Sequence, residues 1–152
     1  MVSLKQIEKK DINLLDNLMQ LYLHELSENF KIDFNNKICK YEYDLNPYFE
    51  NNKAYFILNE ESIVGFILVD IYEEDFEISE IFILNNYKRQ GLAKEAVFKM
   101  FDMYNGNWTI KVVPNSKNAE SFWYNIINEY TNNNFSIDHV GKYERAVLKF
   151  KN

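Results

Sequence analysis

The stretch that decides the fold reads Glu77-Ile78-Ser79-Glu80-Ile81-Phe82-Ile83-Leu84-Asn85-Asn86-Tyr87-Lys88-Arg89-Gln90-Gly91-Leu92-Ala93-Lys94. Its first half is rich in β-branched and aromatic residues, which favours a strand over 76–84. From Leu92 to Tyr104 the apolar residues recur at helical spacing, which predicts a helix. The strand therefore leads through a short turn to the N-terminus of a helix, where several backbone N–H groups have no intrahelical partner.

The turn between the two elements has the composition of an anion-binding site. Gly91 lets the backbone approach an anion closely, and Ala93 keeps the first helical turn clear. Lys88, Arg89 and Lys94 add positive charge to the positive end of the helix dipole. We therefore expect the turn to bind phosphate oxygens.

The rest of the chain supplies the elements of a mixed α/β domain of the α+β type. Apolar spacing predicts helices over 12–22 and 119–130, the second capped by Asn115 or Ser116. Segment 27–52 has no clear period and reads as a loop with short helical turns. Further strands are expected over 4–7, 54–58, 63–71, 108–113, 135–139 and 143–150. No linker or repeat divides the sequence, so we expect a single domain over 1–152.

Composition excludes several classes of protein. The 152 residues are 47% hydrophobic and 26% charged, as in ordinary globular proteins, and no apolar run is long enough to span a membrane. One cysteine and two histidines indicate neither a disulfide framework nor a metal site. A formal charge of −6 disfavours nucleic acid and suits a cationic substrate. The N-terminus lacks the pattern of a secretory signal, so a cytoplasmic location is expected.

The turn resembles the signature of the GNAT acetyltransferases. That signature is Arg or Gln, two free positions, Gly, a free position, then Gly or Ala. Lys88-Arg89-Gln90-Gly91-Leu92-Ala93 matches it except at Lys88, which stands in the place of Arg or Gln. This departure changes a side chain but leaves the backbone groups that would hold a pyrophosphate.

A second segment resembles the same family. Asn115-Ser116-Lys117-Asn118-Ala119-Glu120-Ser121-Phe122-Trp123 is similar to its Asn, Ala and aromatic-pair segment after the fifth strand. Ser116 stands where the family commonly has Asn, so Asn115 or Asn118 takes that role. Trp123 stands where the family commonly has Tyr. With the order of elements, the resemblance covers nearly the whole chain and is strongest to a little-characterised bacterial branch.

The resemblance implies the GNAT acyl-CoA N-acyltransferase fold, a mixed central sheet of about six or seven strands with about four helices. Strands 76–84 and 108–113 would splay apart, and the pantetheine of acetyl-CoA would lie along the backbone of one of them. The implied contacts to this acyl donor come from Ile81, Phe82, Ile83, Lys88, Arg89, Gln90, Gly91, Leu92, Ala93, Lys94, Asn115, Asn118 and Trp123. No metal is implied.

The implied reaction is acyl transfer to an amine by direct attack in a ternary complex. The amine must lose a proton first, and Glu80 is the first choice of base, with Glu77 or a water as alternatives. Strand alternation puts the two carboxylates on opposite faces unless a bulge intervenes. The departing thiolate needs a proton, for which Tyr124 and water are the candidates.

Two other functions are compatible with the sequence. A protein of this fold can bind acyl-CoA or a partner protein without catalysis, and Trp123 in the place of Tyr fits that alternative. A closed cleft would leave only structural contacts. The acceptor amine, a small molecule or a peptide, is not identified by the sequence. An exposed late hairpin or edge strand could pair two subunits as a homodimer.

Overall fold

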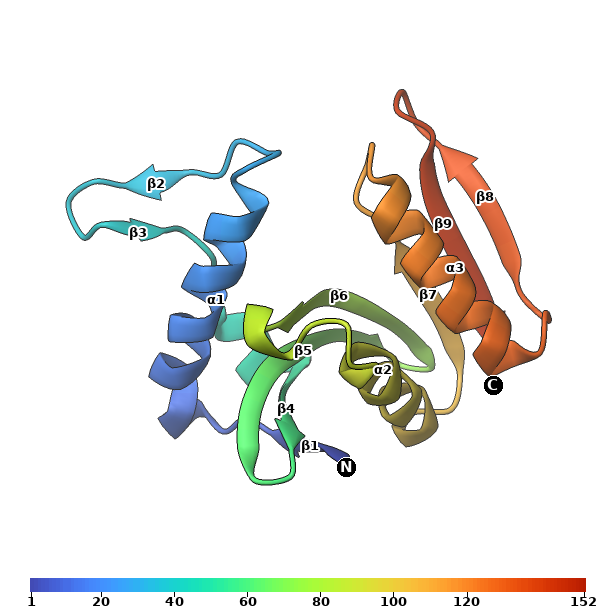
Figure 1. Cartoon of the computed structure of the whole chain (residues 1–152), viewed down its shortest axis with the longest axis horizontal. Helices are drawn as coiled ribbons and strands as arrows, with labels where there is room; N and C mark the ends of the chain where they lie inside the picture. The colour runs from blue at the N-terminus through green and yellow to red at the C-terminus, as the bar shows by residue number, and fades with distance from the viewer.

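The fold is built on a mixed seven-stranded sheet whose strands come from all parts of the chain, with helices on both of its faces (Figure 1). The structure is a computed structural model and describes every residue from Met1 to Asn152. Along the sheet lie β1 (Val2–Gln6), β4 (Lys53–Asn59), β5 (Ser62–Tyr72), β6 (Asp75–Ile83), β7 (Asn107–Lys111), β9 (Arg145–Lys151) and β8 (Ser136–Val140). All neighbours are antiparallel except β6 and β7, which are parallel.

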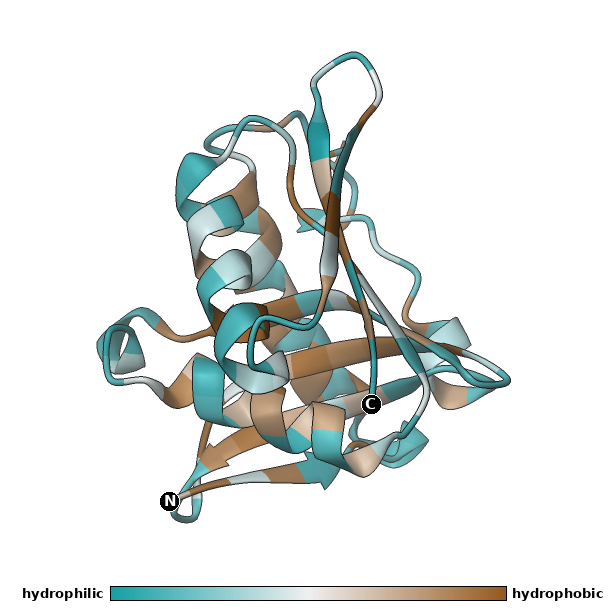
Figure 2. Ribbon diagram, turned by 90° about the vertical axis from the view of Figure 1, so that its right-hand side faces the viewer, coloured by the Kyte–Doolittle hydropathy of each residue, from teal (hydrophilic) through white to brown (hydrophobic).

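Three α-helices cover the sheet. Helix α1 (Ile12–Leu26) packs on one face, while α2 (Leu92–Met103) and α3 (Lys117–Thr131) share the core on the other (Figure 1). Side chains alternate along β5, so Phe66 and Leu68 face α1, whereas Ile67 and Val69 face the larger core of α2 and α3. Figure 2 shows brown, hydrophobic stretches along the central strands, whereas the helices carry both teal and brown residues.

The segment between α1 and β4 holds the shortest elements. β2 (Phe34–Asn35) and β3 (Lys40–Tyr41) form a separate two-stranded hairpin that projects beside α1 (Figure 1). A 3₁₀ turn, η2 (Asn46–Phe49), follows it, and two others, η1 (Lys9–Asp11) and η3 (Asn85–Tyr87), precede α1 and α2. No helix of the chain is long and apolar enough to cross a membrane.

The predicted fold class is confirmed, and each of the seven strands predicted from the sequence is present. The number of helices is lower than expected, because there are three α-helices rather than about four. Segment 27–52, predicted to be a loop with short helical turns, forms the β2–β3 hairpin and a 3₁₀ turn. At α3 the cap is Ser116, whose hydroxyl accepts a hydrogen bond from the Ala119 N–H at 3.2 Å.

Candidate functional site

The centre of the site is the place where β6 and β7 separate. The two strands pair only over Asp75 to Glu77 and the facing residues Asn107 to Thr109. From Ile78 onward the edge of β6 has no partner strand on that side, so its backbone groups are available to a ligand. The splay that the family resemblance implied is therefore present.

A β-bulge decides which face of β6 carries the acidic side chains. The register between β5 and β6 shifts at Ser79, which is left without a partner. Glu77 lies opposite Asp70, and Glu80 lies opposite Leu68. Because Asp70 and Leu68 are two residues apart on β5, the bulge places both glutamates on the face of α1. Regular alternation would have put Glu80 on the opposite face.

The turn before α2 presents free backbone donors. Arg89 has φ +63° and Gly91 has φ +77°, so both adopt the left-handed conformation. The N–H of Glu95 makes the first helical bond to the carbonyl of Gly91, at 3.1 Å. The N–H groups of the three residues between them therefore lack helical acceptors, and no side chain caps this end. This geometry suits an anion.

Two of the basic side chains near the turn are bound elsewhere. Lys88 lies 2.5 Å from a carboxylate oxygen of Glu25 at the end of α1, and Lys94 lies 3.2 Å from Glu129 on α3. Arg89 is exposed and makes no ion pair. Of the three cations predicted to hold phosphate, Arg89 alone has a free side chain.

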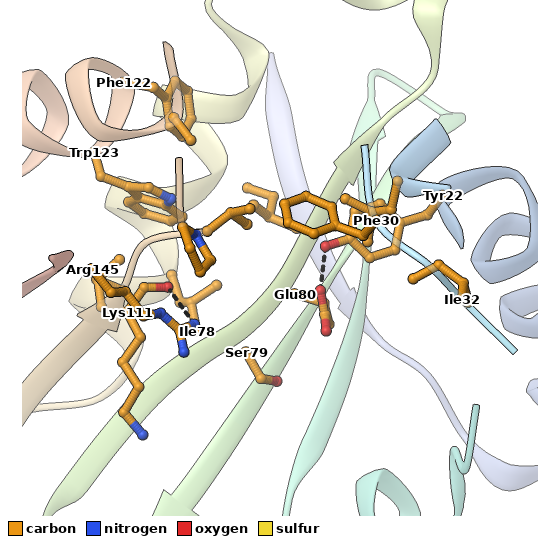
Figure 3. Close-up of a pocket in the computed structure, with 16 residues that line it drawn as sticks. Tyr22, Phe30, Ile32, Ile78, Ser79, Glu80, Lys111, Phe122, Trp123 and Arg145 are labelled. Carbon is orange, nitrogen blue, oxygen red and sulfur yellow. Dashed lines mark hydrogen bonds between the residues drawn. The ribbon is translucent and has the colours of Figure 1, made fainter. Parts of the chain in front are cut away.

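Glu80 is held by two tyrosines from segments that are distant in sequence. The hydroxyl of Tyr22 on α1 donates to Oε2 of Glu80 (Figure 3). The hydroxyl of Tyr43 donates to Oε1 at 3.4 Å. The ring of Tyr22 is itself fixed against Phe66 and Phe82. The carboxylate therefore has a defined orientation and keeps lone pairs for a further partner.

Burial raises the pKa of the Glu80 carboxyl above its ordinary value. The hydrogen bonds from Tyr22 and Tyr43 lower the pKa in part, the nearby charge of Asp70 raises it, and that of Arg145 lowers it. Burial also raises the pKa of both tyrosine hydroxyls, and the Glu80 charge adds to this effect. Glu80 is thus a stronger base than an exposed glutamate, whereas Tyr22 and Tyr43 are weaker acids than an exposed tyrosine.

A cavity of about 420 Å³ opens beside Glu80, on both sides of the splay (Figure 3). It is predominantly apolar, as small-molecule sites usually are. The lining residues come from α1, the following loop, β6, the end of β7, α3 and β9: Tyr22, Leu26, Phe30, Ile32, Ile78, Ser79, Glu80, Ile81, Ile110, Lys111, Val113, Pro114, Ala119, Phe122, Trp123 and Arg145.

Comparison with known proteins identifies the family. The model of the acetyltransferase (GNAT) family matches residues 15–125. The chain belongs to the GNAT acetyltransferase family. No curated protein matches it.

Solved GNAT structures share its fold at low sequence identity. An acetyltransferase from Thermus thermophilus superposes with a TM-score of 0.70 at 16% identity, over 100% of this chain and 97% of the other. A putative GNAT acetyltransferase from Bacteroides thetaiotaomicron gives 0.66 at 14% identity, over 99% and 87%. The PaiA N-acetyltransferase from Thermoplasma acidophilum, in complex with coenzyme A, gives 0.64 at 9% identity, over 100% and 99%.

The remaining GNAT-like positions are divided between the cavity and the surface. Trp123 is buried and lines the cavity. Tyr124, the predicted proton donor, is 40% exposed and packs against Phe135, outside the cavity. One residue along a helix is a rotation of about 100°, which turns Tyr124 away from Glu80. Asn115 and Asn118 are exposed and do not line the cavity either.

Glu77 has its own partner. Its carboxylate lies 3.2 Å from Nζ of Lys111 on β7, and it is not among the residues that line the cavity. Glu80, Ile81 and Trp123, all predicted for the site, therefore line one cavity, whereas Glu77 lies outside its lining.

Three site residues were missed by sequence reasoning. Tyr22 and Tyr43 hold Glu80, and Arg145 lines the opposite wall of the cavity. Tyr22 lies at the end of the helix predicted over 12–22, and Tyr43 lies in segment 27–52, which has no clear period. No local pattern distinguishes these residues from others of their type, because each acts across a long sequence separation.

The burial of Glu80 has a consequence for stability that depends on pH. Its folded-state pKa is raised above the ordinary 4.5, so its contribution is fully present below about pH 4.5 and is lost as pH rises through the folded-state pKa. Glu80→Gln removes this titration. We expect the variant to be more stable than the wild type at pH 8, with a higher Tm, and to lead by a smaller margin at pH 5.

Thermal melts of both proteins between pH 5 and pH 8 measure this difference. Tyr22, Tyr43, Asp70 and Arg145 are the titratable or charged groups that act on Glu80, and all are retained in the variant. If the difference in Tm between the two proteins is constant or narrows toward pH 8, the pKa of Glu80 is not raised in the folded protein.

Proposed function

We propose that the protein transfers an acyl group, most simply acetyl, from acyl-CoA to an amine by direct attack in a ternary complex. One observation carries the proposal: the unpaired edge of β6 joins the turn with free N–H groups to the half-buried carboxylate of Glu80. A phosphate site, an open strand edge and a base thus follow one another along a single stretch of chain.

The acyl donor would be held mainly by backbone groups. The free N–H groups at the start of α2, with Arg89 beside them, would receive the pyrophosphate. The open edge of β6 from Ile81 to Ile83 would pair with the amides of pantetheine. The thioester would then lie at the cavity, near Glu80 and Trp123.

Glu80 would take the proton that the amine must lose before it attacks the thioester carbonyl. Attack forms the C–N bond and a tetrahedral intermediate, whose oxyanion a backbone N–H near Ile81 or Phe82 would stabilise. Collapse of the intermediate breaks the C–S bond, and the nitrogen gives its second proton to water as the thiolate leaves. Tyr22 and Tyr43 would act as positioning residues, because they orient the carboxylate without contacting the reacting atoms.

Water would supply the proton to the departing thiolate. Tyr124 lies outside the cavity, and the indole of Trp123 does not titrate. Tyr22 is the one tyrosine in the cavity lining, but burial and the Glu80 charge raise the pKa of its hydroxyl, which makes it a poor donor.

A non-catalytic acyl-CoA-binding module is the second candidate. The position of Trp123, where the family commonly has Tyr, favours it, because the cavity then lacks a tyrosine suited to protonate the thiolate. The two functions share the donor site and differ in turnover, so the release of free CoA with an amine acceptor distinguishes them.

Calorimetric titration with CoA tests the property that both functions require. We expect one site per chain with a Kd on the order of micromolar to tens of micromolar, a range typical of enzyme substrates. Adenosine, which lacks the pyrophosphate and pantetheine, serves as the control and should bind far more weakly. The absence of a binding signal at millimolar CoA would falsify the proposal.

A further inference from the structure

The cavity contains a positively charged side chain that forms no ion pair with any acidic side chain. Arg145 at the start of β9 lines the cavity, and no carboxylate of the chain lies within 4.0 Å of its guanidinium. Its Nε donates to the carbonyl of Val112 at 2.7 Å, and one terminal nitrogen donates to the carbonyl of Lys111 at 3.4 Å. These bonds fix the side chain and leave other N–H donors unused.

The other cation in the lining is already neutralised. Lys111 lies 3.2 Å from the carboxylate of Glu77. Arg145 is therefore the one cation of the cavity that remains available for an anionic ligand group.

Arg145 and Glu80 lie on opposite walls of the same cavity. Figure 3 shows the guanidinium on the side of β7 and α3, and the Tyr22–Glu80 pair on the side of α1. Both side chains project from the face of the sheet on which α1 lies, because the neighbours of Arg145 on the other face, Ala146 and Leu148, belong to the core of α2 and α3.

We propose that the acceptor is an amine that also carries a carboxylate and an apolar side chain, and that Arg145 is the specificity-determining residue that binds the carboxylate. This inference rests on the proposed acyl transfer. Glu80 would face the amine, Arg145 would bind the carboxylate in the bidentate geometry that guanidinium favours, and Phe30, Ile32 and Phe122 would contact the apolar side chain. Apolar α-amino acids and the termini of short peptides have this chemistry.

The same arrangement selects against simple amines. An amine without a carboxylate would fill the cavity and leave the guanidinium partly desolvated with no counter-charge. Charge-assisted hydrogen bonds lost in this way reduce binding by on the order of tenfold or more. The discrimination should therefore appear mainly in KM for the acceptor.

The test compares paired acceptors that differ only in the carboxylate. Aromatic and branched α-amino acids, each with its carboxamide, are supplied with acetyl-CoA, and the release of free CoA gives kcat/KM. We expect Arg145→Gln to lower the ratio of acid to amide by on the order of tenfold, and Arg145→Lys, which keeps the charge without the planar fork, to lower it less. Using the ratio cancels the intrinsic difference between the two amines.

Lys149→Gln is the matched control, since it removes an exposed cation from the same strand outside the cavity and should leave the ratio unchanged. A ratio that is equal in the wild type, Arg145→Gln and Arg145→Lys overturns the inference, as does transfer to simple amines with none to any amino acid. These outcomes leave the proposed function standing. Failure of the wild type to bind CoA removes the proposed function instead.

Discussion

Replacement of Glu80 by Gln is expected to lower kcat for acetyl transfer by about 10²- to 10⁴-fold at neutral pH, the range that a general base contributes. Gln keeps the size of the side chain and can still accept a hydrogen bond from Tyr22, so the cavity should keep its shape. The affinity for CoA should change by less than about twofold, because the donor site lies along the backbone of β6 and the start of α2.

Glu77→Gln provides the comparison for this experiment. Glu77 lies on the same strand and the same face as Glu80, but its carboxylate is paired with Lys111 outside the cavity lining. We expect it to lose less than about threefold in kcat, a small change beside the loss of a general base. Equal losses in the two variants, or an unchanged rate in Glu80→Gln, would remove Glu80 from the role of base and favour water.

The second large effect is expected at the turn, where Gly91→Asp should raise the Kd for CoA by roughly 100-fold. A carboxylate there meets the pyrophosphate with like charge at the N-terminus of α2. An added Cβ at Gly91 has no heavy atom within 4 Å, so the fold has room for the side chain. The positive φ of +77° is strained for Asp but better tolerated than for most residues.

Two further variants separate the effect of the negative charge on CoA binding from that of backbone strain and from that of the Lys88 side chain. Gly91→Ala introduces at least as much backbone strain without charge and should change the Kd by only a few-fold. Lys88→Gln should also have little effect, because the Lys88 side chain is bound to Glu25 of α1 rather than directed at the turn. Calorimetry with CoA measures all three. A Lys88 variant that weakens binding as much as Gly91→Asp would show that side-chain charge, not backbone, holds the phosphates.

The parts of the fold that follow from local patterns were predictable. The helix after Gly91 and the strand before it have clear periods over many residues, and both lie within a few residues of their predicted ends. The β2–β3 hairpin has strands of two residues, which are too short to show an alternation of apolar and polar side chains. The same loop supplies Tyr43, so the segment without a clear period also holds part of the site.

The candidate site shows the same division. The turn was identified because its free N–H groups follow from a strand that runs into a helix, which is a local property. Tyr22 meets Glu80 across 58 positions of sequence, and Arg145 reaches the cavity from the last strand. Such contacts depend on how the elements pack. Tyr124 was chosen for its nearness in sequence to Trp123, and the rotation of the helix places it on the surface.

The bulge at Ser79 has a consequence for how this site can change over evolutionary time. What directs Glu80 toward α1 is the number of residues between two paired positions of β6, and no side chain of a particular kind is required. Substitutions can therefore accumulate along the strand while the direction of Glu80 is preserved. An insertion or deletion elsewhere in the same strand would turn every later side chain to the other face in one step. The length of β6 should thus diverge more slowly than its composition.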